Sequence, residues 1–105
     1  MARFDVYRNG GPHADAVPYL LDVQSDLLHG LDTRVVIPLR RRDRLPAVRL
    51  PRNLVPVLEV EGIECIVETP KLAAVPTRAL KTPVASLAAS QTEITQALDF
   101  LIHGF

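Results

Sequence analysis

The sequence is poor in the residues that build disulfides, zinc centres and membrane spans. Of its 105 residues, one is cysteine and none is tryptophan. A lone Cys65 excludes an intrachain disulfide and a cysteine-rich zinc site, and it fits a reducing compartment. No apolar run approaches the roughly 20 residues of a membrane span, and the N-terminus lacks the apolar stretch of a signal peptide. These absences predict a cytoplasmic protein with no membrane segment.

Residue patterns typical of metal or cofactor binding are also absent. The three histidines, His13, His29 and His103, share no metal-ligand spacing. Gly10-Gly11 is not followed by the helix and lysine that a phosphate-binding loop needs. The sequence therefore predicts neither a metal nor a cofactor.

One short stretch, DVQSDLL, combines two carboxylates with a hydroxyl. Asp22, Ser25 and Asp26 could serve as general acid and base. Asp and Ser also bond nearby backbone N–H groups where a strand ends, and no histidine or lysine base is close in sequence. We therefore favour the interpretation that these residues form a turn.

Positive charge is concentrated in one segment, although the net charge is zero. Residues 40–52 carry six arginines and one aspartate, whereas the segments before and after them are both acidic. Clustered guanidinium groups can neutralise phosphates, but the segment lacks the interleaved aromatics of a single-strand platform, so direct nucleic-acid binding is not expected. A solvated loop and a site for an acidic peptide, whose carboxylates pair with arginine forks, are the two main alternatives.

Length and composition predict one domain over residues 1–105. This length is close to the commonest domain size, and 48% apolar with 23% charged residues is ordinary globular composition. A body this small buries only somewhat more than about 60% of its unfolded surface, so pairing with a second copy would add burial. We therefore expect a homodimer.

Alternation of apolar and polar residues predicts about five strands. Period-two patterns indicate half-buried strands over residues 2–8 and 19–23. Residues 33–39 are apolar on both faces, as in a central strand, where Pro38 implies a bulge or an edge. Residues 54–69 predict a hairpin with a tight Glu61-Gly62 turn.

Two stretches show no regular period and are expected to be loops. Residues 40–53 form the arginine-rich loop, and residues 69–83 contain three prolines and cross the body of the protein. About five strands followed by one helix favour a small barrel, or a curled antiparallel sheet, with the helix packed against it.

The convincing helix lies at the C-terminal end of the chain. Ser90 and Glu93 have the spacing of a capping box, and an apolar stripe follows on one face, formed by Ile94, Ala97, Leu98, Leu101 and Ile102. Because the stripe runs into the closing DFLIHGF, the last turn is either packed into the core or offered to a partner. We expect a partner.

The order of several segments resembles one family over nearly the whole chain. FDVYRN, YLLDVQSDLL, RVVIPL, LVPVLEVEG and KLAAVP are followed by a capped helix that ends in a residue-Gly-apolar tripeptide. This order is similar to that of the CcdB toxins of bacterial toxin–antitoxin modules. The resemblance implies a mainly β protein with a C-terminal helix: a small SH3-like antiparallel barrel, homodimeric and not an enzyme.

The resemblance also implies partners and binding residues. CcdB toxins bind the A subunit of DNA gyrase and trap the enzyme on cleaved DNA, and a cognate antitoxin with an acidic, disordered C-terminal tail removes them. The residues that match the family's gyrase-binding surface are Leu27, Leu28, Asp99, Ile102, His103, Gly104 and Phe105. The arginine-rich loop, with Arg40, Arg41, Arg42 and Arg44, is expected to bind the antitoxin.

One departure from the family pattern lies at the tip of the helix. Well-studied CcdB toxins end in Trp-Gly-Ile, and the tryptophan stacks on a gyrase arginine, whereas this chain ends in His103-Gly104-Phe105. Imidazole offers a smaller π face, which would weaken a cation–π contact of about 0.5 to 2 kcal/mol. Two alternatives remain: an endoribonuclease like the related MazF toxins, and a non-toxic relative retained for antitoxin binding.

Overall fold

A long central strand organises the structure. The computed structural model describes residues 2–44 and 51–104. Its strands are β1 (Asp5–Arg8), β2 (Tyr19–Asp22), β3 (Thr33–Arg41), β4 (Val57–Val60), β5 (Ile63–Val67), β6 (Ala73–Pro76) and β7 (Ala85–Ser86). Short 3-10 turns link them: η1 (Asp26–Leu28), η2 (Arg42–Arg44), η3 (Thr69–Lys71), η4 (Thr77–Ala79) and η5 (Ala88–Ser90); the helix is α1 (Gln91–His103).

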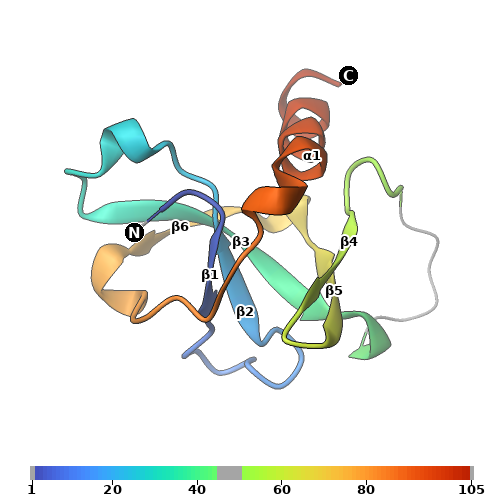
Figure 1. Ribbon diagram of the computed structural model, residues 1–105, viewed down its shortest axis with the longest axis horizontal. Helices are drawn as coiled ribbons and strands as arrows, with labels where there is room; N and C mark the ends of the chain where they lie inside the picture. Colours follow the sequence, from blue (N-terminus) through green and yellow to red (C-terminus); the bar gives the residue numbers. More distant parts are fainter. Residues whose placement is uncertain (1, 45–50, 105) are drawn as a thin grey trace.

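The described strands form one antiparallel sheet that curls into a nearly closed barrel. Their order is β4-β5-β3-β2-β1-β7, and β6 pairs with the first half of β3. Helix α1 stands at one end of the barrel, and its C-terminal end points away from the sheet (Figure 1). The prediction of a mainly β barrel with a C-terminal helix is confirmed.

Pro38 lies where β3 changes partners. Towards β2 the pairing is continuous, from Tyr19 opposite Leu39 to Asp22 opposite Val36. On the other side β3 pairs first with β6 and then with β5. The Pro38 carbonyl accepts a hydrogen bond from Glu68 N–H on that side, so the donor that proline lacks falls in the gap between two partners. The sequence predicts a bulge or an edge at Pro38; the structure has instead a change of partner on one side of β3, and the ladder with β2 is unbroken.

The sheet buries both of its faces. The larger core fills the barrel and includes Val6, Leu21, Ile37, Leu39, Cys65, Val67 and, from α1, Ile94. The opposite face carries a smaller cluster of Tyr7, Val36 and Leu80. Burial on both faces explains why residues 35–39 of β3 are apolar on both faces, as predicted for a central strand.

Two predicted boundaries are wrong, and part of a third segment is not described. The first strand begins at Asp5 and not at residue 2, because Phe4 has a left-handed backbone (φ 74°) and Asp5 N–H closes a turn onto Ala2. Arg40 and Arg41 belong to β3, not to a loop, and pair with Ile66 and Cys65 of β5. Residues 45–50 of the predicted arginine-rich loop lie outside the described residues.

The segment predicted as a long loop, residues 69–83, contains strand β6. Its four residues pair with Thr33–Val36 of β3. A second short strand, β7, follows and pairs with β1 at the end of the sheet. Neither strand shows alternating apolar and polar residues. Ala73–Pro76 consists of small or partly exposed residues, and β7 has only two residues. Pairing with a long neighbour, and not intrinsic propensity, makes β6 a strand.

Helix α1 follows the predicted apolar stripe but not the predicted cap. Ile94 and Ala97 are buried, Leu98 packs against the main core, and exposure increases towards the C-terminal end. Ser90 is the N-cap residue, but its side chain makes no capping hydrogen bond; its backbone (φ −107°, ψ 19°) lies outside the extended region typical of N-caps. None of the described helices is long and apolar enough to cross a membrane.

The predicted hairpin turn is confirmed and is tied to the neighbouring strands. Glu61 and Gly62 both have positive φ, 52° and 80°, as a two-residue hairpin turn requires. Glu61 accepts a hydrogen bond of 2.6 Å from the Tyr19 hydroxyl and one of 3.3 Å from Arg8. Burial, as the larger cause, and then the hydrogen bond to Glu61 raise the pKa of Tyr19 to about 12. The phenol therefore stays protonated and remains a donor.

Candidate functional site

The first exposed apolar group lies between β2 and β3, in residues 25–31, which we call the leucine loop. Leu27 is 90% exposed, and Leu28 and Leu31 are each about half exposed. Single exposed apolar residues are common on protein surfaces, but three leucines in one short loop form a candidate contact surface. Leu27 and Leu28 were predicted to bind a partner; Leu31 was not singled out by the sequence.

The second exposed group is the end of α1, residues 102–105, which we call the C-terminal tip. Ile102 is 66% exposed, and His103 and Gly104 are also exposed, as is Asp99 one turn earlier. Gly104 ends the helix in the left-handed conformation (φ 81°), and its N–H bonds to the Phe100 carbonyl. The described part of the tip therefore points outward, as expected; Phe105 lies outside the described residues.

The two groups are not in contact in one copy of the chain. In Figure 1 the leucine loop, in light blue, and the end of α1, in red, project on the same side of the sheet but at separate places. The leucine loop and the described end of α1 therefore project on the same side of the molecule, where a large partner can reach both (Figure 1).

The turn interpretation of DVQSDLL is confirmed, and the structure gives each of its polar residues a partner. Ser25 Oγ accepts a hydrogen bond of 3.2 Å from Leu27 N–H at the start of η1. Asp26 Oδ1 accepts one of 2.8 Å from Arg3 N–H. Asp22 is fully buried and pairs with Arg34, a partner that sequence reasoning missed. These carboxylates shape the loop.

The Asp22–Arg34 pair is the most buried ionic contact among the described residues. Arg34 Nε and Nη2 donate to the two carboxylate oxygens of Asp22 at 2.8 and 2.9 Å, and Nη2 also reaches the Gln24 carbonyl at 3.3 Å. Burial raises the pKa of Asp22, against the hydrogen bonds from Arg34 and from Gln24 N–H, which lower it. The pair fixes the end of β2 against the start of β3.

The four arginines expected to bind the antitoxin all have carboxylate partners within the chain. Arg40 pairs with Glu68 at 3.1 Å and Arg41 with Asp43 at 2.9 Å; Arg42 pairs with Glu64 at 3.3 Å and Arg44 with Asp15 at 3.8 Å. The hydrogen bond from Arg41 holds the pKa of Asp43 below its ordinary value. The charges of these four arginines are therefore compensated within the chain, which a count of charges along the sequence does not show.

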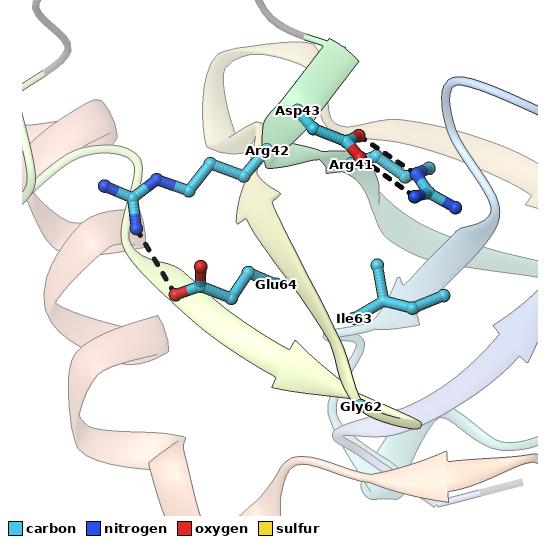
Figure 2. Close-up of a pocket in the computed structure, with 6 residues that line it drawn as sticks. All are labelled: Arg41, Arg42, Asp43, Gly62, Ile63 and Glu64. Atoms are coloured by element: carbon cyan, nitrogen blue, oxygen red, sulfur yellow. Dashed lines mark hydrogen bonds and ion pairs between the residues drawn. The ribbon is translucent and has the colours of Figure 1, made fainter.

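A pocket of about 450 Å³ lies between the end of β3 and the hairpin turn, lined by Arg41, Arg42, Asp43, Gly62, Ile63 and Glu64. Figure 2 shows the Arg42–Glu64 and Arg41–Asp43 pairs on separate sides of the pocket, with the Ile63 side chain near the second. Both arginines are partly exposed, and exposed ion pairs of this kind contribute about 0 to 1 kcal/mol. An acidic ligand can therefore exchange for the internal carboxylates at small cost.

Other reactive groups in the described residues are not arranged for chemistry. No three His, Cys, Asp or Glu side chains in residues 2–44 and 51–104 are placed to hold a metal ion. Cys65 is fully buried, and burial raises the pKa of its thiol to about 11, which keeps it protonated and unreactive at neutral pH.

The surface and fold define the class of protein: a small antiparallel barrel that presents exposed apolar groups from one loop and one helix end to a partner macromolecule. The CcdB protein family matches residues 3–104, so the chain belongs to the CcdB family. Membership of this family implies a toxin of a toxin–antitoxin module that targets DNA gyrase, and not an enzyme. A search of curated proteins finds no match.

Proposed function

We propose that this protein binds the A subunit of DNA gyrase and traps the complex of gyrase with cleaved DNA, and that a cognate antitoxin with an acidic, disordered tail neutralises it. The protein would act in the cytoplasm as a homodimer. In this proposal the contacts to gyrase are made by Leu27, Leu28, Asp99, Ile102, His103, Gly104 and Phe105.

The observation that carries the proposal is the exposure of large apolar side chains at two predicted contact points. Leu27 and Ile102 are 90% and 66% exposed, although the barrel core is well buried. Exposed apolar groups that cluster on one side of a molecule mark a protein-binding surface. Membership of the CcdB family names the partner.

The direct test combines the purified protein with gyrase, supercoiled plasmid and ATP. If the proposal is right, linear DNA accumulates after detergent and protease treatment, because gyrase is held on its cleaved product. A parallel incubation with RNA and no gyrase is expected to leave the RNA intact. Cleavage of RNA in that control would favour the MazF-like endoribonuclease, and inactivity in both assays would favour a relative retained for antitoxin binding.

The arginine segment gives a prediction about the antitoxin. Changing Arg42 and Arg44 together to alanine is expected to weaken antitoxin binding about tenfold, because two charge-assisted hydrogen bonds to the acidic tail are lost. Titration calorimetry with the product of the neighbouring reading frame measures the affinity. The Arg78→Ala, Lys81→Ala double variant removes the same charge from exposed positions elsewhere and is the control; equal affinity for both double variants would remove this role from the segment.

A further inference from the structure

The leucine loop is not held by apolar packing of its own. None of the three residues of η1 is buried. A loop that buries little apolar surface depends on hydrogen bonds for its order. One hydrogen bond of this loop leads to the side chain of Gln24, a residue that is only 8% exposed although it precedes a loop whose Leu27 is 90% exposed.

The Gln24 side chain joins the central strand to the end of η1. Its Oε1 accepts a hydrogen bond of 3.0 Å from Val35 N–H, and its Nε2 donates one of 3.4 Å to the Leu28 carbonyl. Val35 directs its backbone groups towards β2, because its carbonyl accepts from Val23 N–H. Because β2 ends at Asp22, no strand residue is available to accept from Val35 N–H. The Gln24 Oε1 takes that place in the ladder, and the Gln24 Nε2 holds the loop at the Leu28 carbonyl.

The backbone of Gln24 is itself fixed by the buried ion pair. Its N–H donates to Asp22 Oδ1 at 3.0 Å, and its carbonyl accepts from Arg34 Nη2 at 3.3 Å. Asp22 and Arg34 are 0% and 1% exposed. The backbone of Gln24 is therefore held in place by the sheet, and this fixes the position from which its side chain contacts the Leu28 carbonyl.

We propose that Gln24 is a positioning residue for the leucine loop: its amide holds Leu27 and Leu28 in the arrangement that engages the partner, and it makes no contact with the partner itself. This inference rests on the proposed function, in which the two leucines contact gyrase. Ser25 and Asp26 hold the start of the loop through Leu27 N–H and Arg3 N–H. Near its end, the Thr77 hydroxyl donates to the Leu31 carbonyl at 3.4 Å, and among the described residues the Gln24 side chain is the one that links Leu28 to β3.

Two substitutions separate the bonds of Gln24. Gln24→Glu keeps an oxygen for Val35 N–H but loses the donor to the Leu28 carbonyl, and Gln24→Met loses both bonds without adding charge. We expect each to lower affinity for the gyrase A subunit about tenfold and to lower the ¹⁵N order parameters of residues 27–31. The matched controls are Gln91→Glu and Gln91→Met, at an exposed position of α1, which are expected to change neither.

Measuring both the affinity for gyrase and the order parameters keeps this inference distinct from the proposed function. Unchanged affinity in both Gln24 variants, or lower affinity with unchanged order parameters, would overturn the positioning role. If the unmodified protein does not bind gyrase, the proposed function fails, and the order parameters alone decide: increased motion at residues 27–31 supports the role of Gln24, and unchanged motion overturns it. Should Gln24→Met fail to fold, the Gln24→Glu variant carries the same test.

Discussion

Replacing Arg34 by methionine is expected to lower the free energy of unfolding by about 3 to 5 kcal/mol, because it leaves a buried carboxylate without its partner. Asp22 is 0% exposed and receives two hydrogen bonds from Arg34. Methionine is long and flexible enough to fill most of the vacated space, so the loss reports on the charge and not on a cavity. Urea unfolding followed by circular dichroism measures the change.

Two further variants make the Arg34 result decisive. Arg42→Met breaks an exposed ion pair with Glu64, whose side chain is 62% exposed, and is expected to cost less than about 1 kcal/mol. Combining Asp22→Leu with Arg34→Met removes both buried charges and should recover part of the loss. Equal costs for Arg34→Met and Arg42→Met would show that burial of the Asp22–Arg34 pair adds nothing to stability.

The second large effect is expected at the C-terminal tip. Ile102→Lys should weaken binding to the gyrase A subunit by about 30-fold or more, because it places a charge in the proposed apolar contact, where hot-spot residues contribute about 2 kcal/mol or more. Growth inhibition should be lost with it. A cation in the last turn favours the helix, so a folding defect is not expected. Calorimetry with the purified A subunit and growth of expressing cells measure the two effects.

The control for Ile102→Lys adds the same charge to the same helix. Gln96 is exposed on α1, away from the tip, and Gln96→Lys is expected to leave affinity for gyrase within about twofold of the original. Loss of binding in both variants would mean that net charge, and not the Ile102 contact, controls the interaction. A third variant deletes residues 103–105. It is expected to fold; loss of folding would show that the tip belongs to the core.

The fold could be predicted from the sequence wherever local pattern and tertiary packing agree. The hairpin was predicted because Glu61-Gly62 separates two runs of alternating residues, and α1 because its apolar stripe has a helical period. Strand β6 was missed, since Ala73–Pro76 has no alternation and becomes a strand only by pairing with β3. Ser90 does stand at the N-cap, but the capping hydrogen bond is missing because the preceding turn η5 leaves its backbone outside the extended region.

Most of the exposed apolar residues of the candidate site were singled out from the sequence, whereas the partners of its charged residues were not. Leu27, Leu28 and Ile102 came from the resemblance to CcdB toxins, and the exposure of all three agrees with it. The carboxylates that pair with Arg40 and Arg42 come from β5 and the turn after it, more than 20 positions along the chain. Contacts over such separations leave no signal in a local charge count, and the same is true of the bond from Gln24 to Val35.

The hydrogen bond between the Tyr19 hydroxyl and Glu61 has a consequence for where the barrel opens locally. On one side the β4–β5 hairpin is held by a ladder with β3. Towards β1 and β2, the described residues show apolar packing in the main core and, at the hairpin turn, one phenol–carboxylate bond and one exposed arginine, but no ladder. A seam closed by side chains opens more readily than one closed by a ladder. Local opening is therefore expected to begin between the β4–β5 hairpin and strands β1 and β2. The hairpin would move as a unit about its ladder with β3, while β1, β2 and β3 stay paired.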